Sequence, residues 1–178
     1  MSKHLVLTLI GPDQVGIVEK ITEKVLKHKG NVEESKMARL GGEFAMLLLI
    51  SVPEQEFEKI NTSLDDLKNE GFHFFIKETR PKETDKYGGW LPYRIDVSGA
   101  DHEGIINSIT HHLSETGINV ETLDTNTSAA PMSGTLLFTM TAIVIVPPHI
   151  TYNSWLDPLD AIANEMHVNI DVSPYTGK

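Results

Sequence analysis

Residues 11–18 read Gly-Pro-Asp-Gln-Val-Gly-Ile-Val, and residues 99–106 repeat this pattern as Gly-Ala-Asp-His-Glu-Gly-Ile-Ile. Both copies follow a strand-like apolar run and precede an amphipathic helical pattern. The match continues at the same shift of 88 positions (99 − 11), because residues 31–33 and 119–121 both read Asn-Val-Glu. Further along the shift becomes 94, so the second copy has six additional residues in its hairpin (94 − 88). A repeat of this length is a whole small domain, and the chain is predicted to be a tandem duplication.

Each copy shows the order strand, helix, strand, strand, helix, strand. In the first copy, Asp13 is suited to cap a helix that begins near Val15, and Gly41-Gly42 predicts a hairpin turn. Residues 54–69 read as one further helix, and residues 126–134 are the longer hairpin of the second copy. The fold class is therefore α+β, with two ferredoxin-like βαββαβ domains at residues 1–80 and 93–178 and a linker at 81–92.

The apolar periodicity predicts one hydrophobic core for each domain. The nearly continuous apolar run at residues 5–10 is typical of a central buried strand. The expected core residues of the first domain are Val6, Leu9, Ile17, Ile21, Leu48 and Ile50, and those of the second are Ile95, Ile105, Ile109, Phe138, Ala142 and Leu159.

Charge and composition exclude several classes of protein. The 178 residues carry a formal net charge of −10 and no cysteine, so disulfides and Cys-ligated zinc are excluded. Residues 93–178 hold 2 basic against 10 acidic residues, which disfavours direct binding of nucleic acid. No signal peptide and no apolar run long enough to span a membrane are recognisable, and a cytoplasmic protein is expected.

The repeated turn has the chemistry of a small amino-acid site. Exposed N–H groups at a helix start suit a carboxylate, and Asn or Asp side chains suit an ammonium group. The turn and the Asn-Val pair lie at opposite ends of one helix, so both could flank one ligand only where two domains face each other. The alternative is purely local, with Asp13 as a helix cap and Gly16 as a close contact. The candidate ligand-binding residues are Asp13, Gly16, Ile17, Asn31 and Val32 in the first copy, and Asp101, Gly104, Ile105, Asn119 and Val120 in the second.

Asp-x-x-Gly-Ile after a first strand, then an amphipathic helix, then Asn-Val, resembles the ACT domain, a ferredoxin-like module that senses amino acids. Both copies show this pattern, and a tandem pair of this length without a catalytic domain is similar to the glycine cleavage system transcriptional repressor family. The resemblance implies a protein that binds a glycine-like or serine-like amino acid. It also implies control of a transcription regulator of glycine or one-carbon metabolism through protein contact. The second copy departs from the pattern at Ala100, His102 and Glu103, which makes the first copy the stronger candidate for binding.

Three other readings compete with an amino-acid sensor: an enzyme, a nucleic-acid binder and a structural scaffold. RNA-recognition domains share this order of elements but need aromatic residues on the two central strands, and residues 5–10 have none. An enzyme is disfavoured because no catalytic motif is present, and no cofactor is expected. His102 between two acidic residues could begin a metal site, but a solvated turn is the simpler interpretation. A structural scaffold that has lost its ligand stays open. A homodimer is expected because edge strands need cover, and a bulky side chain in place of Gly16 is expected to abolish binding while leaving the fold nearly intact.

Overall fold

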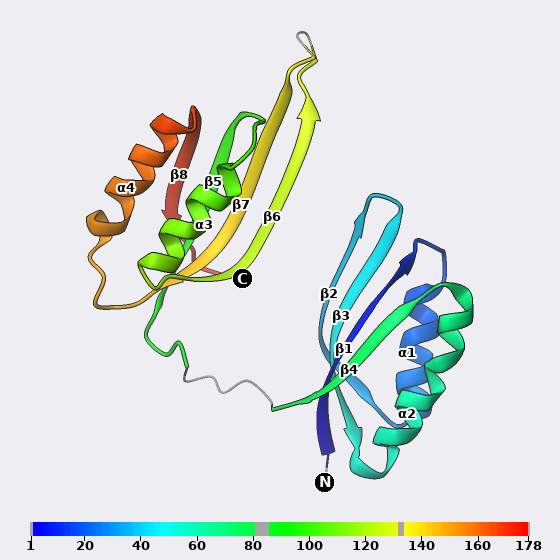
Figure 1. The fold of residues 1–178 in the computed structure, drawn as a ribbon. Coiled ribbons are helices and arrows are strands. Elements are labelled where there is room, and N and C mark those ends of the chain that lie inside the picture. The colour runs from blue at the N-terminus through cyan, green and yellow to red at the C-terminus, as the bar shows by residue number, and fades with distance from the viewer. Residues whose placement is uncertain (1, 81–85, 132–133, 178) are drawn as a thin grey trace. The chain divides into compact units, whose positions relative to one another are not determined.

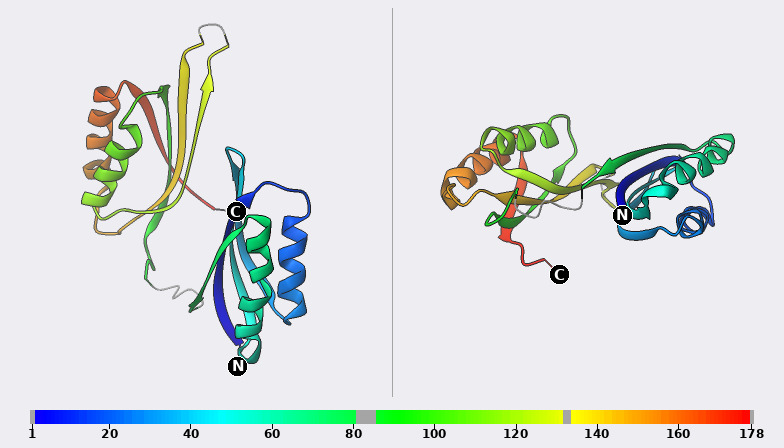
Figure 2. Two further views of the ribbon diagram at one scale, coloured as in Figure 1. Left: turned by 45° about the vertical axis from the view of Figure 1, so that its right-hand side comes forward. Right: turned by 90° about the horizontal axis from the view of Figure 1, so that it is seen from below.

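A computed structural model describes residues 2–80, 86–131 and 134–177. The chain divides into two compact units, residues 1–83 and 84–178, each with its own sheet and helices. Strand β5 begins at Leu91, inside the stretch predicted as a linker, and residues 81–85 of that stretch lie outside the described residues. Figure 1 shows the elements of each unit, and Figure 2 shows that the helices of a unit cover one face of its sheet.

The first unit is a four-stranded antiparallel sheet with strand order β2-β3-β1-β4. Connections β1-α1-β2 and β3-α2-β4 place the helices on one face, which confirms the βαββαβ arrangement. Its elements are β1 (Ser2–Pro12), α1 (Ile17–Lys27), β2 (Asn31–Leu40), β3 (Glu43–Pro53), η1 (Glu54–Glu56), α2 (Phe57–Ser63), η2 (Asp65–Glu70) and β4 (His73–Thr79).

The second unit repeats this topology with strand order β6-β7-β5-β8. Its elements are β5 (Leu91–Ala100), α3 (Ile105–Glu115), β6 (Asn119–Ala129), β7 (Leu136–Val146), α4 (Tyr152–Glu165) and β8 (Val168–Pro174). The predicted hairpin loop 126–134 was too wide, because β6 continues through Ala129, pairing with β7 at Leu136. Residues 132–133 of that prediction lie outside the described residues.

The second helix of the first unit is not the single helix predicted for residues 54–69. It is broken at Leu64, where the N–H of Leu67 bonds to the carbonyl of Leu64 at 3.0 Å in a 3₁₀ turn. The ammonium group of Lys24 on α1 donates to the carbonyl of Ser63 at 2.6 Å and to the carboxylate of Asp66. In an uninterrupted α-helix the Ser63 carbonyl would accept the N–H of Leu67. Here that N–H bonds to Leu64 instead, and the Ser63 carbonyl accepts a hydrogen bond from Lys24.

Each unit has a separate hydrophobic core between its sheet and its helices. The expected core residues are buried, with one exception. Strand β1 turns Leu5, Leu7 and Leu9 toward the helices, whereas Val6 is half-buried on the opposite, open face. Successive side chains of a strand point to opposite faces, so the continuous apolar run supplies one covered face and one uncovered face.

Two repeated glycines are explained by packing. A Cβ at Gly11 would lie 2.3 Å from the ring of Phe72, and a Cβ at Gly99 would lie 2.8 Å from Val168. The glycine that opens each repeated segment therefore lets the first residues after the second helix lie against the first strand. Among the described residues, no helix is long and apolar enough to cross a membrane.

Candidate functional site

The turn before α1 is held by a left-handed glycine. Gly16 has φ 90° and ψ −4° and is the N-cap residue of α1, and its carbonyl accepts the N–H of Lys20 at 2.9 Å. The side chain of Ile17 is buried in the core, so Ile17 can offer only backbone groups to a ligand. Nothing lies within 4 Å of a Cβ built on Gly16, and Val15 beside it is fully exposed. The first turn is open to solvent.

The conformation of Gly16 bears on one expectation. An L side chain is strained at this φ whatever the free space, so a bulky replacement is expected to lower the stability of the first unit by about 1–2 kcal/mol as well as altering the turn. Loss of ligand binding in such a variant would therefore be confounded with loss of stability.

Asp13 is not the helix cap that the sequence predicted. Among the described residues no side chain makes a capping hydrogen bond at Gly16, because the helix begins two residues later than expected and Asp13 precedes the N-cap by three residues. The Asp13 carboxylate accepts instead from Nη1 of Arg39 at 3.3 Å, and the Asp13 N–H donates to the carbonyl of Gly42 at 3.3 Å. Asp13 thus connects the turn to the β2–β3 hairpin through these two hydrogen bonds. Asp13 and Arg39 are too far apart in the sequence for a local motif to predict this contact.

The second turn has the same backbone and a different environment. Gly104 has φ 97°, but the methyl group of Met166 lies 3.4 Å from the Cβ position there. His102 Nε2 donates to the carbonyl of Met166 at 2.6 Å, and Nδ1 donates to the carbonyl of Glu103 at 3.1 Å. Carbonyls only accept, so both bonds form together when the ring is doubly protonated, and the bond to Met166 and then the bond to Glu103 raise the pKa of His102. Met166 and His102 therefore lie against the second turn, although residues 101–104 are exposed, as residues 13–16 of the first turn are.

Both ring nitrogens of His102 contact backbone carbonyls. In the described part of the chain, no group of three or more His, Asp or Glu residues has metal-binding geometry. Asp101 and Ile105 lie at the two ends of this turn. The Asp101 N–H donates to the carbonyl of Leu136 at 2.8 Å, and the Ile105 side chain is buried.

The repeated Asn-Val-Glu lies at a β-bulge in both units. The strand register shifts between Val32 and Glu34, and again between Val120 and Thr122, so the glutamate is the extra residue. Val32 and Val120 are half-buried against their cores. Asn119 donates to the bulged Glu121 at 2.9 Å, and the bulged Glu33 pairs with His4 at 3.3 Å.

Asn31, the counterpart of Asn119, is exposed at the first residue of β2. Helix α1 separates it from Gly16, and eleven residues span about 16 Å. The structure therefore does not bring the Gly16 turn and Asn31 together within the first unit. In the second unit, α3 separates Gly104 from Asn119 in the same way. Sequence reasoning missed Arg39, Gly42 and Met166, whose part in the turns depends on pairing between elements.

Comparison with known proteins gives a family match within the first unit. Residues 3–76 match the ACT domain family. The glycine cleavage system transcriptional repressor of Escherichia coli strain K12 is 33% identical over 103 residues, which are 56% of this chain and 53% of that protein. The chain thus spans about half the length of this curated relative.

Two further matches differ in extent. A UPF0237 protein of Methanosarcina mazei is 32% identical over 57 residues, which are 32% of this chain and 62% of that protein. The crystal structure of an unknown protein from Galdieria sulphuraria superposes with a TM-score of 0.86 at 31% identity, covering 99% of this chain and 100% of that one. The tandem architecture is therefore shared along the whole chain.

Proposed function

We propose that this chain is a non-catalytic regulatory protein that senses a small amino acid, because residues 3–76 match the ACT domain family and 103 residues are 33% identical to the glycine cleavage system transcriptional repressor. Its output is contact with a partner regulatory protein, in the control of glycine or one-carbon metabolism. The acidic second unit, with 2 basic and 10 acidic residues in positions 93–178, argues against direct contact with nucleic acid.

The open first turn carries this proposal. The N–H groups in the first turn of α1 lack acceptors within the helix, and the Ile17 N–H makes only a long contact of 3.5 Å with the carbonyl of Gln14, so a ligand carboxylate can bind at Gly16 and Ile17. The ligand ammonium group can bind the Asp13 carboxylate, because a carboxylate accepts several hydrogen bonds and keeps capacity beyond its contact with Arg39. At the matching place in the second unit, Met166 and His102 lie against the turn and narrow the space for a ligand, so one ligand per chain is expected. Asn31 and Val32 contribute only where another ACT domain adjoins the turn.

The test is isothermal titration of the full chain with glycine, serine and a panel of larger amino acids. Asp13→Asn removes the charge that holds the ammonium group and is expected to weaken binding at least about tenfold, a typical cost for a charge-assisted hydrogen bond. Asp65→Asn is the matched control, because Asp65 is an exposed ion-paired aspartate of the same unit, bonded to Lys68 on its own 3₁₀ turn. Absence of both heat and thermal shift with every amino acid would refute the sensor.

A structural scaffold is the second candidate, and a specific observation favours it. The repeated residues all have a role in folding: Gly11 admits Phe72, Gly16 supplies a left-handed turn, and Asn31 begins the bulged strand β2. Such roles would preserve the motif without any ligand. Titration without binding, together with partner contact that is indifferent to added amino acids, would make the scaffold the better account.

A homodimer belongs to the same proposal. Strands β2 and β6 are each bonded to one neighbour only among the described strands, so each leaves backbone groups along its outer edge. Unpaired edges favour association between copies. Light scattering that gives a strict monomer at high concentration would contradict the dimer.

A further inference from the structure

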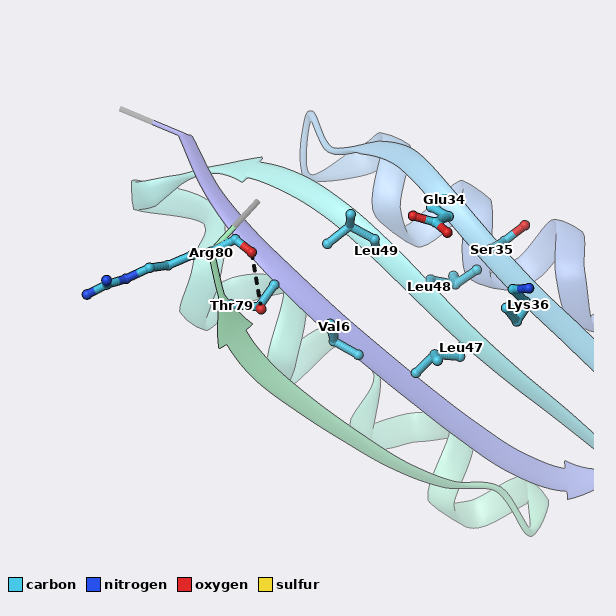
Figure 3. Close-up of a pocket in the computed structure, with 9 residues that line it drawn as sticks. All are labelled: Val6, Glu34, Ser35, Lys36, Leu47, Leu48, Leu49, Thr79 and Arg80. Atoms are coloured by element: carbon cyan, nitrogen blue, oxygen red, sulfur yellow. Dashed lines mark hydrogen bonds between the residues drawn. The ribbon is translucent and has the colours of Figure 1, made fainter. Parts of the chain in front are cut away.

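The open face of the first sheet, opposite its helices, is apolar at its centre. Ile10, Leu47 and Phe75 are 49%, 42% and 62% exposed, and Val6 and Leu49 are half-buried beside them. Contiguous exposed patches of this kind mark interaction sites in soluble proteins. Figure 3 shows Val6, Leu47 and Leu49 on neighbouring strands of this face.

A hollow of about 290 Å³ lies among these side chains. Val6, Leu47 and Leu49 line it from β1 and β3, and residues 34–36 line it from β2. This space is large enough for the side chain of a Leu or Phe, the kind of anchor that contributes most energy to protein interfaces.

The second unit serves as an internal control for what the fold itself requires. At the positions equivalent to Val6, Thr8 and Leu47 it carries Arg94, Asp96 and Thr141, by the shifts of 88 and 94. The Arg94 guanidinium donates two bonds to Asp96, at 2.6 and 2.8 Å, and Thr141 donates to Asp96 at 2.7 Å. The fold therefore tolerates a hydrogen-bonded polar cluster here, and the apolar residues of the first unit are not a requirement of the fold.

The flanks of the apolar centre are basic. Lys36 on β2 lies opposite Leu47, and Lys77 on β4 lies opposite Val6. Neither lysine has an acidic partner in residues 2–80, 86–131 and 134–177. Arg80 and Glu34 also line the hollow, and the Arg80 side chain extends away from its apolar residues in Figure 3. An occupant with acidic flanks matches this distribution.

We propose that the open face of the first sheet binds an amphipathic helix of a partner protein, with large apolar anchors along one stripe and acidic residues beside it. A helix suits the surface because the other face of the same sheet already packs α1 and α2. The proposal rests on the proposed function, since it specifies the surface and the chemistry of the partner contact.

The test uses fluorescence anisotropy of the full chain with a labelled 18-residue helical peptide that has leucine on one stripe and glutamate elsewhere. The combined replacement Val6→Arg, Thr8→Asp and Leu47→Thr transfers the polar cluster of the second unit to the first. It is expected to keep the circular dichroism spectrum and to weaken peptide binding at least about tenfold. Leu26→Thr is the matched control, because Leu26 is 72% exposed on α1, and it should bind as the parent does.

A second variant keeps the proposal testable if the triple replacement fails to fold. Lys36→Glu with Lys77→Glu leaves the apolar centre intact and should reverse the preference, so that a peptide with lysine in place of glutamate binds better. Equal binding of both peptides by the parent protein, or binding of neither, would overturn the proposal. These outcomes are independent of the amino-acid titration, so the surface and the sensor can fail separately.

Two other occupants are outcomes of the same experiment. If the triple replacement converts a dimer to a monomer, the face belongs to a second copy and the proposal is wrong. Because the chain has no cysteine, Leu47→Cys supplies a single thiol on this face. Rapid reaction of that thiol with a maleimide supports an accessible surface, whereas protection in the folded monomer would show that the chain itself covers the face.

Discussion

Replacing Gly16 by alanine separates the backbone role of this glycine from any role in binding. Gly16 has φ 90°, where an L residue costs about 1–2 kcal/mol because its Cβ approaches the carbonyl oxygen. No atom lies within 4 Å of the added methyl group, so no steric cost is expected. The alanine also reduces the conformational entropy of the unfolded chain, which stabilises the folded protein by about 0.4–1 kcal/mol. A control variant with the same stabilisation is therefore needed to isolate the backbone strain.

Gly42→Ala provides the cancellation. Gly42 also has open space around its Cβ position, and its φ is not in the left-handed region, so its variant has the entropic gain without the strain. The free energy of unfolding of the two variants should therefore differ by about 1–2 kcal/mol. For a unit of this size the difference corresponds to roughly 4–16 °C in melting temperature. Gly16→Asn should fall between them, since asparagine tolerates positive φ better than alanine.

The assay is urea unfolding of the full chain followed by far-ultraviolet circular dichroism. Both tryptophans lie in the second unit, so fluorescence reports on that unit and should not change in either variant. Equal stability of Gly16→Ala and Gly42→Ala would refute the argument from backbone strain. A change in the tryptophan transition would show that the effect is not local to the first turn.

Three further predictions follow from packing and charge. Gly11→Ala forces the Phe72 ring to move and should destabilise the first unit by about 1–3 kcal/mol in the same urea assay. An effect as small as that of Gly42→Ala, where the added methyl group meets no other atom, would contradict this steric clash. Leu48→Ala removes a fully buried side chain and should cost about 2–5 kcal/mol in thermal unfolding, and a loss below 1 kcal/mol would place Leu48 outside the core. The raised pKa of His102 means that its bonds to the Met166 and Glu103 carbonyls stabilise the second unit fully below pH 6.5 and lose strength as pH rises through the folded-state pKa. Tryptophan-monitored unfolding from pH 5 to 9 should show this loss in the parent protein and not in His102→Asn, and identical pH profiles would disprove the assignment.

Much of the architecture could be predicted from residues 11–18 and their repeat, because local periodicity and turn chemistry depend on neighbours in the chain. The two domains, their topology, the Gly41-Gly42 turn and nearly all expected core residues were predictable in this way. The prediction of Val6 as a core residue was wrong, because a continuous apolar run does not indicate which face of the strand the helices cover. The break in the second helix was equally hidden, since it depends on Lys24 from α1 taking the Ser63 carbonyl.

In the candidate site, too, some features depend on local sequence and others only on the tertiary structure. The sequence by itself determined that both units carry a glycine turn before a helix, because a repeated motif records the same local backbone twice. Only the tertiary structure decided that the first turn is linked through Asp13 to Arg39 with open space at Gly16, while Met166 and His102 lie against the second. The reason is physical: Met166 is 64 positions from His102, and Arg39 is 26 positions from Asp13. Contacts between residues so far apart exist only after the sheet has paired and the helices have packed on it.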